Sequence, residues 1–218
     1  MIVRQTVGFV PVAAAVLGNA LVTMIKAGAA ITSGSSVMFS EAVHSLADTL
    51  NQAFILIGVR RSYKKPDDDF GYGYGNERFF WALISACGIF FIGAGITLYN
   101  GVSSLINPRP LEIHTLVFVV LGVSFIIESL TLWVAARGLR KSYPDAAWRE
   151  RLVLADPSTL AVYLEDSVAL IGVAVATVSI GASYYTGNVF WDGLGSIVIG
   201  VLLAATAIIL ITKNRSYL

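Results

Sequence analysis

The sequence is poor in charged residues and in cysteine. Of its 218 residues, 13% are charged and 56% are hydrophobic, whereas soluble proteins average about 25% and about 45–50%. A water-soluble globule is therefore excluded as the starting class. The single cysteine, Cys87, excludes an intrachain disulfide framework and a cysteine-based metal cluster. Fifteen Lys and Arg against 14 Asp and Glu leave a net charge of +1 without a basic stripe, which argues against a nucleic-acid partner.

What the sequence has instead is long apolar stretches separated by turn and cap signals. A helix needs about 20 mostly apolar residues to cross about 30 Å of hydrocarbon. We therefore predict an all-α membrane protein in which residues 1–218 form one bundle of six transmembrane helices. The expected spans are 8–30, 36–59, 79–105, 113–136, 160–184 and 189–212.

Lysine and arginine are concentrated in alternate connections between these spans. The connections after the second and fourth spans are rich in both, and the C-terminus adds Lys213 and Arg215, whereas the other connections contain only Arg109. Basic residues are retained on the cytoplasmic side of a membrane. Both termini are therefore predicted to face the cytoplasm or its equivalent.

The second span carries a stripe of polar residues. At about 100° per residue, Glu41, His44, Asp48 and Gln52 fall within an arc of roughly 80°, with Asn51 behind them. A charge at the bilayer centre costs from about 3 to more than 10 kcal/mol, so this stripe must face protein or water. His44 and Asp48 lie one helical turn apart and can bind the same small cation.

Two ligands do not complete a tetrahedral metal site, and the fifth span supplies a second acidic pair, Glu165 and Asp166. The two spans together favour a divalent-cation site. The alternative is that these polar residues only hold helices together by hydrogen bonds, as is common in membrane bundles.

Other ionisable residues have simpler interpretations. Glu128 and Asp192 each stand alone on a helix, which favours helix packing or support of the site. Lys26 ends the first span, where its ammonium group can snorkel to the interface. The acidic run 67–69 could collect cations, but a solvated turn is the favoured interpretation because adjacent side chains diverge.

Several motifs together resemble one family. They are residues 33–35 (SGS), 41–48 (EAVHSLAD), 70–81 (FGYGYGNERFFW), 164–166 (LED) and 192–196 (DGLGS). In combination they resemble the six-helix membrane domain of the cation diffusion facilitators, the zinc-transporter superfamily, and are most similar to the zinc transporter-9-like branch.

This resemblance implies a proton-coupled exporter of divalent cations, usually Zn²⁺, that works as a homodimer by alternating access. His44 and Asp48 match the family's helix-two ligands, and Asp166 matches the second helix-five ligand. Val162 occupies the place of the usual first helix-five ligand. Either Glu165 substitutes for it, water completes the shell, or the metal preference is altered. One imidazole with carboxylates suits Zn²⁺ and also Mn²⁺, Fe²⁺ or Co²⁺.

The family's cytoplasmic metal-binding domain is not expected within these 218 residues, so dimer contacts would depend on the helices. The expected location is a bacterial inner membrane or an organellar membrane. A transporter rather than an enzyme is the favoured class. A non-transporting membrane scaffold is the main alternative, and an intramembrane metal hydrolase ranks last because no substrate-binding groups or further general base can be identified.

Overall fold

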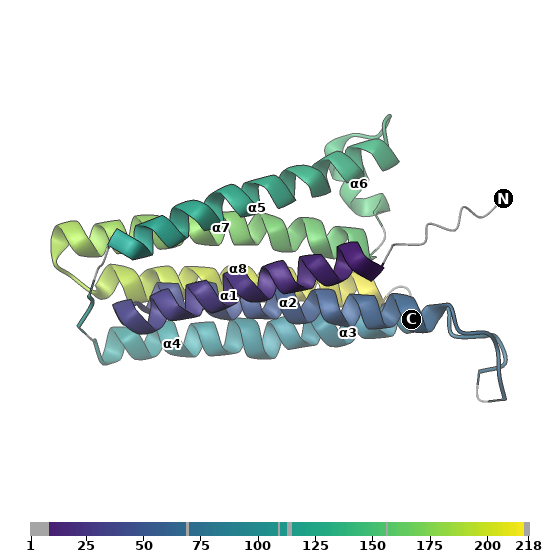
Figure 1. Cartoon of the computed structure of the whole chain (residues 1–218), viewed down its shortest axis with the longest axis horizontal. Coiled ribbons are helices and arrows are strands. Elements are labelled where there is room, and N and C mark those ends of the chain that lie inside the picture. Colours follow the sequence, from purple (N-terminus) through teal and green to yellow (C-terminus); the bar gives the residue numbers. More distant parts are fainter. Residues whose placement is uncertain (1–8, 69, 109, 113–114, 156, 216–218) are drawn as a thin grey trace.

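The computed structural model describes residues 9–68, 70–108, 110–112, 115–155 and 157–215. These residues form helices and their connections, without a β-strand among them. The long helices run side by side along the longest dimension of the molecule (Figure 1). The elements are α1 (Phe9–Ser33), α2 (Ser36–Ser62), α3 (Glu77–Gly88), the π-helix η1 (Ile89–Ala94), α4 (Gly95–Ile106), α5 (Thr115–Ser142), α6 (Trp148–Leu154), α7 (Pro157–Thr186) and α8 (Phe190–Arg215).

Each apolar range expected from the sequence falls on one of the long helices or on the continuous unit α3–η1–α4. Within the described residues, four segments are long and apolar enough to cross a membrane. Residue 8 of the expected first span and residues 113 and 114 of the expected fourth span lie outside the described part of the chain. The four segments are Glu77–Ile106, Thr115–Ser142, Thr159–Thr186 and Phe190–Arg215.

Two features of the helices were not expected from the sequence. The third apolar range contains a π-helix, Ile89–Ala94, which packs against α8 and α2. A wider helical turn leaves the apolar composition unchanged, so hydropathy does not reveal it. The short helix α6 lies between α5 and α7, where only a connection was expected.

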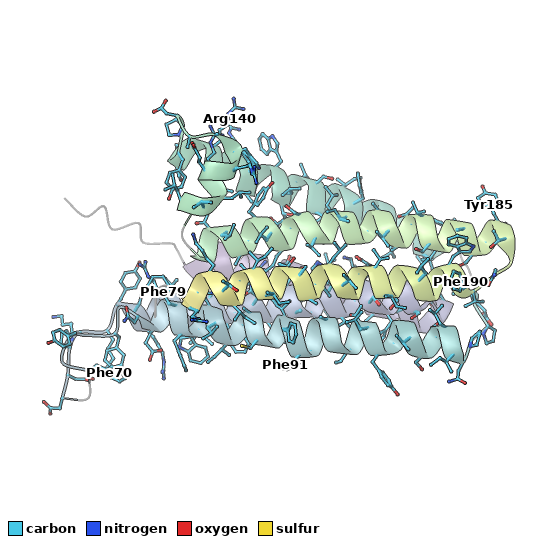
Figure 2. The ribbon with its side chains drawn as sticks, turned by 180° about the vertical axis from the view of Figure 1, so that it is seen from behind. Phe70, Phe79, Phe91, Arg140, Tyr185 and Phe190 are labelled. Atoms are coloured by element: carbon cyan, nitrogen blue, oxygen red, sulfur yellow. The ribbon has the colours of Figure 1, made fainter. Side chains whose placement is uncertain are left out.

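The two ends of the bundle differ in their side chains. The α1 helix begins and α8 ends at the same end (Figure 1). Arg140 and Phe70 lie at that end, whereas Tyr185 and Phe190 lie at the opposite one (Figure 2). We call the former the basic end, because the last turns of α2, α5 and α8 meet there with their lysines and arginines. These are Arg60, Arg61, Arg140, Lys141, Lys213 and Arg215. Arg109, predicted for the other side, lies outside the described residues.

Glycines allow α4 and α8 to approach closely. A Cβ atom on Gly101 would lie 2.9 Å from the backbone nitrogen of Ile197, and one on Gly200 would lie 2.7 Å from Leu98 Cγ. Small residues at such positions are typical of membrane helix pairs, because apolar side chains gain nothing by leaving lipid unless they pack tightly. The α8 helix also packs against α7 and α2, so it ties both sides of the bundle together.

The start of α2 is fixed by a carboxylate from α8. The hydroxyl of Ser35 donates to Asp192 Oδ1 at 2.5 Å, and the backbone nitrogen of Ser36 donates to Asp192 Oδ2 at 2.5 Å. The backbone nitrogen of Val37 donates to Oδ1 at 3.5 Å. The first N–H groups of a helix have no acceptor within the helix. The carboxylate of Asp192, on the neighbouring helix α8, accepts hydrogen bonds from these groups. Gly34, at φ +67°, makes the turn from α1 that allows this contact.

Candidate metal centre

An acidic cavity of about 390 Å³ lies between α1, α2, α5 and α7. Four carboxylates line it, one from α2, one from α5 and two from α7. They are Asp48, Glu128, Glu165 and Asp166. The cavity therefore brings together the acidic residues of the second and fifth apolar ranges, which are far apart in the sequence, and adds one from the fourth.

The cavity extends from the middle of the bundle toward the basic end. Its α5 lining continues to Ala135 in the second half of that helix, and its α7 lining begins at Val162, near the start of α7. The side chains of Asp48 and Glu128 are 17% and 13% exposed. These two carboxylates are therefore partly exposed at the cavity rather than sealed in the core.

His44 lies beside this cavity, one turn before Asp48 on α2. Its Nε2 atom is 3.4 Å from Asp48 Oδ2, without the alignment that a hydrogen bond requires. The imidazole is 1% exposed, and neither ring nitrogen has a hydrogen-bond partner among the described residues. Buried polar groups are nearly always satisfied. An unpartnered imidazole beside a carboxylate is thus suited to receive a cation.

Glu165 is oriented by a chain of hydrogen bonds that crosses three helices. The side-chain amide nitrogen of Asn51 donates to Glu165 Oε2, and the Ser85 hydroxyl donates to Asn51 Oδ1. These two contacts fix which way the Asn51 amide points. The second oxygen of Glu165, Oε1, is buried and has no hydrogen-bond partner among the described residues. Glu165 therefore has one oxygen held in place and one available for a ligand.

Val162 lines the same cavity as Asp48 and Asp166. It is 38% exposed, so its side chain faces open space rather than the packed core. The place that the family resemblance assigns to a further ligand is thus at the cavity but carries an apolar side chain. Glu165 also lines this cavity, and its unpartnered oxygen makes it a neighbouring carboxylate that can fill that role.

Three of the candidate ligands, Asp48, Glu165 and Asp166, line the cavity, whereas His44 does not, and the four do not close around a centre. Within the ranges that the structure describes, no three His, Cys, Asp or Glu side chains lie close enough together to hold an ion. The arrangement is that of ligands on separate helices that a cation could draw together.

The environment of Lys26 differs from the sequence-based expectation. Its side chain has no exposed surface, and its Nζ atom lies 3.0 Å from Glu41 Oε2 and 3.5 Å from Glu128 Oε1. The prediction that Lys26 snorkels to the interface was therefore wrong. The reason is that α1 continues to Ser33, which leaves Lys26 well inside the helix. Lys26 joins α1 to α2 and α5 beside the cavity.

The supporting residues predicted from the sequence have different surroundings. Glu41 faces Lys26, Glu128 both faces Lys26 and lines the cavity, and Asn51 orients Glu165. Asp192 lies at the start of α2, apart from the residues that line the cavity. Sequence reasoning missed Ser85, since a serine within an apolar range gives no signal of its partner.

The acidic loop after α2 is engaged in its own structure. The Lys64 ammonium donates to Asp67 Oδ2 at 2.6 Å, and the Tyr74 hydroxyl donates to the same oxygen at 2.8 Å. These bonds, that from Lys64 above all, lower the pKa of Asp67 to about 2. Asp67 thus stays ionised and paired at every physiological pH, which fits a solvated turn. Asp69 lies outside the described residues.

Comparison with known proteins identifies the family of this chain. Residues 12–218 match the model of the cation efflux transmembrane domain. The chain is 43% identical over 204 residues to metal tolerance protein C4 of Arabidopsis thaliana. The aligned region covers 90% of this chain and 44% of that protein. The chain is also 38% identical over 203 residues to the human mitochondrial proton-coupled zinc antiporter SLC30A9. That aligned region covers 92% of this chain and 36% of the human protein. The chain thus spans less than half the length of either relative.

Proposed function

This chain belongs to the family of cation efflux transmembrane domains, and we propose that it carries a divalent cation across a membrane in exchange for protons. The nitrogen and oxygen donors of the candidate site favour Zn²⁺ as that cation. The observation that carries the proposal is the cavity in which carboxylates of α2 and α7 face the same space beside an unpartnered histidine. The human relative of this sequence is named a proton-coupled zinc antiporter, and the plant relative a metal tolerance protein.

The proposed ligands are His44, Asp48, Glu165 and Asp166. One imidazole nitrogen and three carboxylates can provide the four N and O donors that Zn²⁺ prefers. Mn²⁺, Fe²⁺ and Co²⁺ accept the same donors and are alternative cargoes, whereas Cu⁺ would favour sulfur ligands. Glu41, Glu128 and Asn51 support this site by holding charges and side chains around it.

Proton exchange follows from the ligands themselves. A histidine or carboxylate must be deprotonated to bind a metal, so cation entry expels protons and proton entry helps to expel the cation. The cavity extends toward the basic end, and basic residues mark the cytoplasmic side. A cation from the cytoplasm would therefore enter through this cavity, and the carrier would then open to the other side.

Zinc-driven proton movement in reconstituted vesicles is the direct test. We expect a zinc gradient to change the internal pH of vesicles that contain the protein, and not of empty vesicles. Zinc affinity should fall as the pH is lowered, because protons then compete with zinc for His44 and the carboxylate ligands. The expected loss is about tenfold per pH unit for each displaced proton. Calorimetric titration that finds no saturable zinc site would favour the scaffold alternative.

A second prediction concerns the missing helix-five ligand. We expect Glu165→Gln to weaken zinc binding by about 10- to 100-fold, because the amide is a poorer metal ligand than the carboxylate. The double variant Glu165→Gln with Val162→Asp should recover most of that affinity, since position 162 lines the same cavity. Calorimetry on the purified variants measures both effects. Normal binding by the single variant would mean that water or another residue completes the shell.

The remaining proposals follow from the family. We propose six membrane spans, with α1 and α2 added to the four apolar segments, and both termini on the cytoplasmic side or its equivalent. A homodimer within an organellar or bacterial inner membrane completes the proposal. Cysteine accessibility to membrane-impermeant reagents at the basic end, in sealed vesicles of known orientation, tests the topology.

A further inference from the structure

A buried lysine beside the acidic cavity contacts two carboxylates at once. Lys26 Nζ lies 3.0 Å from Glu41 Oε2 and 3.5 Å from Glu128 Oε1, and its side chain has no exposed surface. Placing an ammonium group inside a membrane helix bundle is costly. One positive charge does not neutralise two carboxylates, so the pairing leaves the region acidic. Charge neutralisation therefore does not explain why a lysine is buried at this position.

Glu128 links this ion pair to the cavity. Its carboxylate lines the cavity together with Asp48, Glu165 and Asp166, while its Oε1 atom faces Lys26. If Lys26 were absent, α5 would add a fourth carboxylate to those of α2 and α7. Carboxylate-rich, oxygen-only surroundings suit Ca²⁺, which takes six to eight oxygen ligands at about 2.3–2.6 Å, and octahedral ions such as Mg²⁺ and Mn²⁺.

We propose that Lys26 is a specificity-determining residue, a built-in cation whose ion pair with Glu128 competes with the transported ion for that carboxylate. This inference rests on the proposed function. By holding Glu128, Lys26 limits the oxygen donors in the cavity, and its positive charge repels any ion that approaches Glu128. Four-coordinate Zn²⁺ retains His44 and the carboxylates of α2 and α7.

The discrimination arises from a difference in ligand number. An ion that needs six or more oxygen donors loses one of its few protein ligands when Glu128 is withheld, and it meets a like charge at that side of the cavity. Zn²⁺ needs four donors and gains from an imidazole nitrogen that Mg²⁺ and Ca²⁺ do not favour. Specificity of this kind comes from a repulsive element placed against the wrong ligand.

The test compares Mn²⁺ with Zn²⁺ in the Lys26→Gln variant. We expect the ratio of Mn²⁺-driven to Zn²⁺-driven proton flux in vesicles to rise about tenfold, and the Mn²⁺ dissociation constant of the purified protein to fall by about the same factor. The double variant Lys26→Gln with Glu128→Gln should return to the wild-type ratio, since it has no carboxylate to release. Lys65→Gln, which removes the same charge from the exposed loop, should leave the ratio unchanged.

A second variant protects the test against misfolding, because Lys26→Gln leaves Glu41 as a buried, unpaired charge. Lys26→Gln with Glu41→Gln removes one charge of each sign and still releases Glu128, so it should also gain Mn²⁺ affinity. An unchanged ratio in both variants, in a protein whose wild type exchanges zinc for protons, overturns the inference. Absence of zinc-driven flux in the wild type would instead reject the proposed function. The Mn²⁺ dissociation constants of the purified wild type and variants would still test the role of Lys26.

Discussion

Zinc-driven proton flux is expected to fall to the level of empty vesicles when Asp48 is replaced by alanine, and likewise when His44 is replaced. His44 Nε2 lies 3.4 Å from Oδ2 of Asp48, which lines the cavity, and both ring nitrogens of His44 lack a hydrogen-bond partner among the described residues. Loss of one ligand from a four-coordinate site removes a large part of the binding free energy. We expect at least a 100-fold loss of zinc affinity, roughly 3 kcal/mol.

The variant Asp48→Asn separates a ligand from a residue that only holds helices together. Asparagine keeps the size and one acceptor oxygen of aspartate, but it carries an NH₂ donor in place of the other oxygen and loses the charge. A metal ligand should therefore fail in both substitutions, whereas a helix contact should tolerate asparagine. Asp68→Ala, which removes a carboxylate from the exposed loop, serves as the control and should retain full flux. Normal flux in both Asp48 variants, with the protein folded, would reject the metal site.

We expect Asp192→Ala to lower the free energy of unfolding strongly. Asp192 accepts hydrogen bonds from the Ser35 hydroxyl and from the backbone nitrogens of Ser36 and Val37. Its removal leaves buried donors at the start of α2 without a partner, at a cost of about 3 kcal/mol. We expect the thermal unfolding midpoint in detergent to fall by roughly 10 °C.

Asp192→Asn provides a graded comparison. The amide keeps one acceptor oxygen for the helix start but places an NH₂ group where Oδ2 accepts from the Ser36 nitrogen at 2.5 Å. Its unfolding midpoint should therefore lie between those of the wild type and Asp192→Ala. The exposed Asp145→Ala variant should unfold as the wild type does. Zinc affinity of the folded Asp192 variants should change little, because Asp192 does not line the cavity. A large loss of zinc affinity without a loss of stability would contradict this role.

The family could be predicted from sequence, and the comparison confirmed it over residues 12–218. The motif around His44 and Asp48 is local, so its residues lie next to one another in the printed chain and need no fold to be recognised. That Val162 stands in the place of a helix-five ligand is likewise readable from the sequence, through the resemblance to the family. Its consequence is not, because spacing does not say whether Glu165 has a free oxygen.

The apolar helices, the basic residues at alternate connections and the polar stripe on α2 follow from the sequence, since each depends on composition or on periodicity along one helix. Which residues meet across helices follows from the packing of the helices. The packing buried Lys26 between Glu41 and Glu128, joined Asn51 to Ser85 and Glu165, and set Asp192 at the start of α2. The physical reason is that a buried polar group must find a partner, and in a helix bundle that partner usually lies on another helix, at a distance along the chain that no local pattern encodes.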